Sequence, residues 1–250
     1  MRIVTLNIRH GGGRRIDVLA DALVSHAADT LVISEFRANE SGQRLRLRLA
    51  DAGYAHWADG APPRTANSVA IASRSPVERR PLPLSSANRH RVVEVGLDGL
   101  TLGAVYFPLN TDKVAFWQTE FLPLAAARIA QPYVFIGDWN TGAHYIDEEA
   151  ATFFAAQEFA AMTASGWTDA WRAIHPGGRE YSWFSNRGHG FRLDHAFLSP
   201  WVSPRLRAAT FSQAERLAQL TDHAALVVDL AEPPATDGSP EELVHDRRAR

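Results

Sequence analysis

Short runs of apolar, often β-branched residues recur along most of the chain, and they predict the strands of a sheet-rich protein. These runs lie at residues 2–8, 30–35, 67–73, 91–97, 100–107, 133–140, 191–199 and 223–230. Apolar residues at helical spacing predict helices between them, at residues 16–27, 43–52, 113–129 and 148–164. Many strands and fewer helices favour an α/β protein in which the helices cover the faces of sheets.

The pattern changes only near the end of the chain. No internal repeat, coiled-coil heptad or low-complexity linker interrupts residues 1–231, so we expect one domain there. Residues 232–250, EPPATDGSPEELVHDRRAR, combine proline, glycine and charge with few apolar residues. This composition predicts a disordered tail.

Composition narrows the chemistry. The 250 residues include no cysteine, which excludes disulfides, thiolate catalysis and cysteine-based metal sites. No stretch has the apolar length of a secretory signal or a membrane span, so we expect a cytoplasmic protein with no membrane partner, and no obligate protein partner is evident. The net charge of −2 gives no overall attraction for nucleic acid, and one lysine against 25 arginines indicates composition bias.

Polar side chains stand at the ends or edges of several predicted strands, where α/β proteins often place their sites. A single carboxylate after a strand is more often a helix cap or a turn residue. Here, however, the pattern repeats on separate strands, in the order Asn7, Glu35, Asp138, Asn140, Asp194 and the pair Asp222–His223. The whole set, rather than any one member, indicates a site.

In chain order, these residues and their surroundings resemble the endonuclease/exonuclease/phosphatase superfamily, and within it the exonuclease III-type abasic-site nucleases. The resemblance is carried by the segments TLNIRHG, LVISEFR, NSVAIASR, VYFPLN, VFIGDWNTG, GWTDAWRAIHP, YSWFSNRGHGFRLDHAFLSP and TDHAALVVDL. It implies an α/β (α+β) fold, a four-layer sandwich of two packed, mostly antiparallel β-sheets flanked by helices. It also implies a metal-dependent phosphodiester hydrolase whose site lies at one end of the sheets.

Under this resemblance, Glu35 binds a divalent cation, Mg²⁺ or Mn²⁺, with Asn7 and Asp222 completing or bordering the site. Mg²⁺ prefers oxygen ligands and keeps several waters, so one or two carboxylates suffice. Asp138 is the expected general base for the attacking water, and Asn140 orients that water or holds a phosphate oxygen.

The same resemblance assigns His223 and Tyr106 to the phosphate. Asp194 is expected to fix the tautomer of His223 and to favour its charged form. Successive side chains of a strand point to opposite faces, so His195 is expected to turn away from the site and pack in the interior.

Substrate contacts follow from the aromatic and basic positions. Trp183, Phe191 and Leu193 match the apolar pocket in which such nucleases hold a flipped-out, base-less sugar. Strict alternation along a strand would instead place Phe191 and Leu193 on the face opposite Asp194, which leaves core packing as the alternative. Arg37 is expected to contact phosphate through its guanidinium, and Asn110 is a further substrate-binding candidate, as is Asn7.

Some features differ from the repair enzymes and leave the substrate open. Ser34 and Leu109 replace residues that are often polar amides or other polar groups in that family, and the segment NTGAHYIDEEAATFF is acidic. DNA is the expected partner, with a small phosphoester such as a phosphoinositide, nucleotide or sugar phosphate as the alternative. A non-catalytic binding module is the remaining possibility. Arginines such as Arg187 and Arg192 are candidates for holding a phosphodiester backbone.

Overall fold

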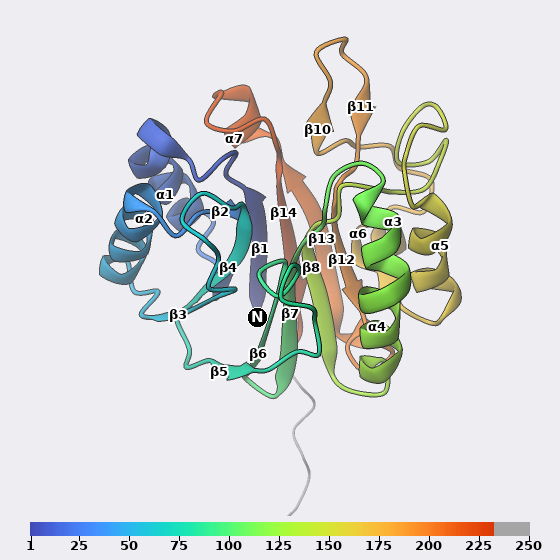
Figure 1. Ribbon diagram of the computed structural model, residues 1–250, viewed down its shortest axis with the longest axis horizontal. Coiled ribbons are helices and arrows are strands. Elements are labelled where there is room, and N and C mark those ends of the chain that lie inside the picture. Colours follow the sequence, from blue (N-terminus) through green and yellow to red (C-terminus); the bar gives the residue numbers. More distant parts are fainter. Residues whose placement is uncertain (233–250) are drawn as a thin grey trace, which may run out of the picture.

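Two six-stranded sheets packed against each other form the centre of the computed structural model, which describes residues 1–232 (Figure 1). The first sheet has the order β13-β14-β1-β2-β4-β3, with strands β1 (Arg2–Asn7), β2 (Thr30–Phe36), β3 (His56–Asp59), β4 (Ser68–Ser73), β13 (Leu206–Ser212) and β14 (Ala225–Leu230). The second has the order β5-β6-β7-β8-β12-β9, with strands β5 (Glu78–Arg80), β6 (Val92–Leu97), β7 (Leu100–Tyr106), β8 (Tyr133–Asp138), β9 (Thr168–Asp169) and β12 (Asp194–Leu198). A separate ribbon of β10 (Trp183–Phe184) and β11 (Gly190–Phe191) projects beyond one end of the sheets (Figure 1).

Strand directions match the expected fold class. The pairs β1–β2 and β7–β8 are parallel, and the other strand pairs of both sheets are antiparallel. Parallel neighbours need a crossover, and each pair is joined by a helical one. The helical segments are α1 (Ile16–Ser25), α2 (Glu40–Asp51), α3 (Asp112–Phe116), the π-helical η2 (Trp117–Phe121), α4 (Leu122–Arg128), α5 (Ala156–Ala164), α6 (Ala170–Ile174), α7 (Ala214–Leu217) and the short η1 (Gly13–Arg15) and η3 (Ser203–Arg205).

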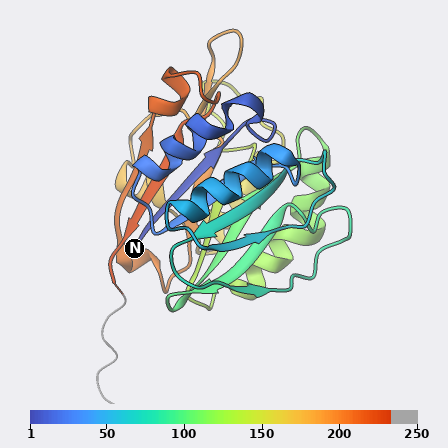
Figure 2. The same cartoon turned by 90° about the vertical axis from the view of Figure 1, so that its left-hand side faces the viewer.

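Three apolar clusters hold the layers together. Between the sheets, strand residues such as Val32 and Val134 are fully buried in one apolar cluster. On the outer side of the first sheet, α1 and α2 pack through residues such as Leu19 and Leu45, and Figure 2 shows both helices lying across that sheet. Helices α3, α4 and α5 cover the second sheet. The predicted four-layer sandwich is therefore confirmed.

The helices agree with the sequence in three of four places. Residues 16–27 and 43–52 lie on α1 and α2, and 113–129 form the continuous helical stretch α3-η2-α4. The helix predicted at 148–164 is wrong in its first half, because α5 begins only at Ala156. Glu148 instead closes a loop: its buried carboxylate accepts hydrogen bonds from the backbone N–H groups of Thr152 (2.7 Å) and Phe153 (3.0 Å). The tail expected at 232–250 lies, apart from its first residue, outside the described residues.

Candidate active site

The predicted polar side chains converge at one end of the two sheets. Asn7, Tyr106 and Asp138 are the last residues of β1, β7 and β8, and Asp194 is the first residue of β12. A cavity of about 370 Å³ opens there. Its walls are formed by His10, Glu35, Leu109, Asn110, Lys113, Asn140, Thr152, Phe153, Phe154, Trp183, Phe191, Leu193, Asp222 and His223.

A β-bulge positions Glu35. The register of β2 against β4 shifts between Ser34 and Phe36, and Glu35 between them has φ 57°, the left-handed region that non-glycine residues seldom occupy. Bulges re-aim side chains next to sites. Here the Glu35 carboxylate accepts from Asn7 Nδ2 at 3.2 Å and from the backbone N–H of His10 at 2.6 Å. The carboxylate is thereby fixed in the wall of the cavity.

Asp138 is the last residue of β8, and its position depends on the glycine before it. Gly137 has φ 150°, and a Cβ at this position would lie 2.0 Å from the carbonyl oxygen of Val105 on the parallel neighbour β7. Only glycine permits this close approach. The Asp138 side chain is buried and accepts from Asn7 Nδ2 at 2.8 Å and from the backbone N–H of Asn140 at 2.9 Å.

Asp194 and His223 form the interaction that the resemblance implies. Asp194 pairs with Asp138 across the β12–β8 register, and its Oδ2 lies 2.8 Å from His223 Nδ1, with both side chains buried. A carboxylate only accepts, so Nδ1 carries the proton and donates. Nε2 of His223 remains available to the cavity.

His195 turns the other way, as the alternation predicts. It is fully buried, and its Nε2 lies 2.9 Å from the carbonyl oxygen of Thr141. Its ring packs against Phe159 with centroids 4.6 Å apart. The two Asp-His sequences of the chain therefore have different surroundings.

Burial and charge set the protonation of this cluster. Burial, followed by the charge of Asp194, raises the pKa of Asp138 to about 7. Burial alone would lower the pKa of His223, but the charge and hydrogen bond of Asp194 outweigh it and raise that pKa to about 10. The arrangement therefore holds an imidazolium beside a carboxyl group that titrates near neutrality.

Tyr106 and Arg37 are linked through Asn67, which is not among the expected site residues. Asn67 Nδ2 donates to Tyr106 Oη at 3.4 Å, and Arg37 Nε donates to Asn67 Oδ1 at 2.6 Å. Burial, followed by the charges of Glu35 and Asp138, raises the pKa of Tyr106 above its ordinary value. The phenol therefore stays protonated and can act as a hydrogen-bond donor.

The residues present fit a magnesium-type site with few protein ligands. Among residues 1–232, no three acidic, histidine or cysteine side chains cluster into a ready-made metal cage. Asn7 Oδ1 accepts from the backbone N–H of Arg9 at 2.8 Å, so its Nδ2 is directed at Glu35. Asp222 accepts from Trp183 Nε1 at 3.1 Å and lies 3.8 Å from Arg9. Glu35 remains as the carboxylate that can serve such an ion, which keeps most of its waters.

The apolar wall lies where the resemblance implies. Trp183, Phe191 and Leu193 all line the cavity beside His223. The argument from strict alternation fails here, because Leu193 lies between β11 and β12 and belongs to neither strand. All three residues of the expected pocket are thus brought together with the polar cluster.

Two other expectations need correction. Arg192, a candidate for backbone binding, is buried and forms ion pairs with Asp147 (2.8 Å) and Asp169 (2.7 Å). Asp147 and Glu148, which make the segment 140–154 look acidic, are themselves buried. The acidity of that segment is therefore largely withdrawn from the surface.

Several residues that line the cavity carry no clear signal in the sequence. Lys113, the one lysine, reaches it from α3, and Phe153 and Phe154 reach it from the loop closed by Glu148. The isolated lysine is the only signal in the sequence, and it indicates composition bias there. The helical pattern at residues 148–164 places the two phenylalanines on a helix.

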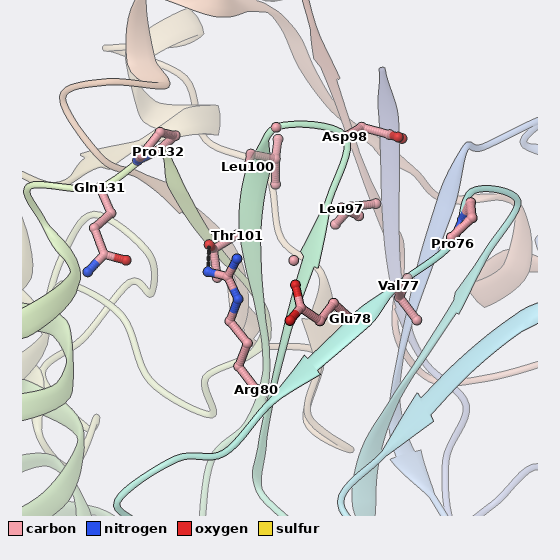
Figure 3. A pocket seen from close by; sticks show the side chains of 12 residues that line it. Pro76, Val77, Glu78, Arg80, Leu97, Asp98, Leu100, Thr101, Gln131 and Pro132 are labelled. Carbon is pink, nitrogen blue, oxygen red and sulfur yellow. Dashed lines mark hydrogen bonds between the residues drawn. The ribbon is translucent and has the colours of Figure 1, made fainter.

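A second cavity, of about 610 Å³, lies at the opposite end of β7 and β8 from Tyr106 and Asp138 (Figure 3). Its lining includes Arg80, whose guanidinium donates to Thr101 Oγ1 at 2.7 Å. Figure 3 shows no grouping of acids with a histidine here. This cavity therefore lacks the set of residue types that lines the first one.

Comparison with known proteins finds a matching family model and solved structures of similar fold. A model of the endonuclease/exonuclease/phosphatase family matches residues 4–223. The 3′ phosphatase NExo from Neisseria, bound to product DNA hairpin, has a TM-score of 0.79 and 24% identity, over 92% of this chain and 99% of that one. The 3′–5′ exonuclease NExo from Neisseria meningitidis gives 0.79 and 24%, over 92% and 100% of the two chains.

An AP endonuclease from Archaeoglobus fulgidus has a TM-score of 0.80 and 21% identity, with 92% of this chain and 99% of that chain covered. At such identities the likeness establishes a shared fold, and function has to be argued from the site. No curated protein matches the chain at a significant level. Within residues 1–232, no helix has the length and apolar character needed to cross a membrane.

Proposed function

Because the chain belongs to the endonuclease/exonuclease/phosphatase family, we propose that it is a divalent-metal-dependent phosphodiester hydrolase acting on DNA, as an abasic-site endonuclease or a 3′-exonuclease. One observation carries the proposal: Asp194 and Asp138 lie opposite each other on the adjoining strands β12 and β8, and His223, bonded to Asp194, lines a cavity that also contains Glu35 and an aromatic wall. Hydrolysis of a phosphodiester needs an activated water, neutralisation of phosphoryl charge and help for the leaving oxygen.

Asp138 is the proposed general base. Its pKa of about 7 lies near neutrality, where a base is both unprotonated and a competent proton acceptor. The attacking water transfers its proton to the Asp138 carboxylate as its oxygen bonds to phosphorus. Asn140 stands two residues on, with its Nδ2 donating to the carbonyl oxygen of Phe107 at 3.0 Å, which leaves Oδ1 to orient the water.

His223 and Tyr106 are the proposed hydrogen-bond donors to the phosphate of the substrate. The imidazolium of His223 has its Nδ1 fixed by Asp194, so Nε2–H is the group that can donate to a non-bridging phosphate oxygen. Charge-assisted donors of this kind are stronger than neutral ones. Tyr106 adds its phenol, with Asn67 and Arg37 behind it.

Glu35 is the proposed ligand of Mg²⁺ or Mn²⁺, with Asn7 and Asp222 at the border of the site. When bound, the ion supplies charge neutralisation to the phosphoryl oxygens. Asn7 ties Glu35 to Asp138 through its Nδ2, so the metal side and the base side of the site are held in one arrangement.

A DNA substrate is supported by the wall of Trp183, Phe191 and Leu193, which offers apolar surface to a sugar or base. The solved structures of similar fold include a 3′ phosphatase bound to a DNA hairpin and an AP endonuclease, which supports the same reading.

The test is a substrate panel with Mg²⁺ or with EDTA. It contains an abasic duplex, a duplex with a recessed 3′ end, a 3′-phosphate duplex, and small phosphomonoesters and phosphodiesters. We expect metal-dependent cleavage of DNA, reduced about 100-fold or more in Asp138→Asn. Asp98→Asn, an exposed position at the far end of the sheets, serves as the control. Turnover confined to small esters would contradict the DNA assignment.

A further inference from the structure

The single lysine of the chain occupies an unusual place. Lysine and arginine together number 26, and Lys113 is the only lysine. Its side chain is 3% exposed and lines the cavity that contains Glu35 and His223. The other cationic positions of the sequence use arginine, so the one lysine stands at the site itself.

The surroundings of Lys113 leave its charge poorly compensated. Its ammonium donates to the carbonyl oxygen of Asn140, and within residues 1–232 no carboxylate oxygen lies within 4.0 Å of it. An ammonium carries three N–H donors, so the protein supplies an acceptor for only part of its capacity. Burial lowers the pKa of Lys113 to about 8, with the charge of Asp138 acting in the opposite direction.

Local stability does not explain a lysine at this position. Lys113 is the second residue of α3, at the start of the helical stretch that runs to Arg128, where a positive charge opposes the helix dipole. A buried cation without a counter-ion also costs free energy. Unfavourable features that persist together are characteristic of functional sites.

We propose that Lys113 binds a phosphate oxygen of the substrate, as a substrate-contacting residue on the wall of the cavity formed by α3. The inference rests on the proposed phosphoesterase function and adds a group to it. A phosphate oxygen brings the negative charge and the acceptors that the ammonium lacks in the free protein. A compact ammonium on a flexible stem suits this crowded wall, whereas a planar guanidinium needs room for two parallel hydrogen bonds.

Kinetics of matched variants test the contact. A hydrogen bond to a charged group is worth about 10- to 150-fold in rate, so Lys113→Met is expected to lower kcat/KM by that factor. Lys113→Arg is expected to restore only part of it. Arg79→Met, at an exposed position of β5, is the control and should match the wild type. Thermal unfolding of each variant reports whether the fold is intact.

The same kinetics identify which phosphate is bound. If Lys113 contacts the scissile phosphate, Lys113→Met lowers kcat on a dinucleotide as much as on a longer strand. If it contacts the neighbouring phosphate, the loss appears on the longer strand and falls mainly on KM. Wild-type rates for Lys113→Met on both substrates would overturn the proposal.

A second measurement does not depend on turnover or on the variant. Protein labelled with ¹³Cε-lysine gives a single lysine resonance, because Lys113 is the only lysine. Titration with inorganic phosphate is expected to shift this resonance to saturation, whereas chloride at equal ionic strength is expected to leave it in place. Equal responses to both salts would show that Lys113 is only a cap on the Asn140 carbonyl, and would overturn the proposal.

The two measurements separate the inference from the function on which it rests. Absence of hydrolysis by the wild type, together with a phosphate-specific shift, contradicts the proposed function and supports the Lys113 site. Metal-dependent hydrolysis by the wild type, together with no shift and an active Lys113→Met, supports the function and contradicts the inference.

Discussion

Replacing Asp194 by asparagine tests the central interaction of the site. The substitution keeps the size of the side chain and removes its charge, so the packing at the start of β12 should persist. The hydrogen bond to His223 joins two buried groups at 2.8 Å. What the variant loses is the negative charge of Asp194, which keeps the imidazole of His223 protonated and oriented through the hydrogen bond to Nδ1.

The magnitude follows from that hydrogen bond. An interaction with a charged group contributes about 1.5–3 kcal/mol, and each 1.36 kcal/mol corresponds to a tenfold change in rate. We therefore expect Asp194→Asn to lower kcat/KM about 10- to 150-fold. Burial lowers the pKa of His223, and the Asp194 charge and hydrogen bond raise it to about 10. Without that carboxylate, the burial of the ring is opposed only by the more weakly acting Asp138 and Asp222, so the pKa is expected to fall toward its ordinary value of about 6.5.

The wild type and Asp194→Asn should also differ in how their rates depend on pH. In the wild type, His223 stays charged up to about pH 10, so rising pH between about 6 and about 9 should not weaken its contribution. In Asp194→Asn the same rise should discharge the ring, and the deficit relative to the wild type should grow. Steady-state rates across this range, with Asp98→Asn as control, measure both effects. A variant that stays within about threefold of the wild type at every pH would refute the reasoning.

Three further predictions concern the scaffold and the substrate. Arg192→Met removes the ion pairs of two buried carboxylates, leaving, within residues 1–232, Asp147 with Arg172 and Asp169 with no arginine, and should lower the free energy of unfolding by about 3–5 kcal/mol, measured by urea denaturation. Burial raises the pKa of Asp147 and of Asp169, but Arg192 outweighs it and holds both pKa values low. The two carboxylates should therefore stabilise the wild type above about pH 4, and this contribution should be lost on further acidification. A wild-type free energy of unfolding that does not fall in acid would contradict this. Phe154, 47% exposed on the cavity rim, is expected to stack on a base, so Phe154→Ala should raise KM for an oligonucleotide about 5- to 150-fold, whereas Trp201→Ala, exposed and away from the cavity, should match the wild type.

Much of the fold could be predicted because its central strands carry continuous apolar runs. Strands β1, β2, β7 and β8 are buried on both faces, and such runs are readily detected. The edge strands are harder to detect, since β9 has two residues and β13 mixes exposed with buried positions. The helix assigned to residues 148–155 failed because the buried carboxylate of Glu148 organises a loop there, and tertiary contacts of this kind are not encoded in periodicity.

Those site residues that residue type and chain order identify could be predicted from the sequence. Those whose position depends on the three-dimensional arrangement of loops and strand ends could not. The Asp194–His223 contact follows the resemblance. The bulge that aims Glu35 has no sequence signal, since its backbone conformation is unusual for glutamate. Lys113 and Phe154 were missed because their placement depends on how α3 and the Glu148 loop meet the ends of the strands.

The most direct test is single-turnover cleavage of abasic and 3′-recessed DNA by the folded wild type and by His223→Ala, each with Mg²⁺ and with EDTA. We predict that the wild type cleaves at least one of these substrates only when metal is present. His223→Ala, assayed at a temperature where its thermal unfolding profile shows it folded, should lose about 100-fold or more in rate. A folded wild type that leaves both DNAs intact with Mg²⁺ and with Mn²⁺, or a variant as fast as the wild type, would contradict the proposed role of this site.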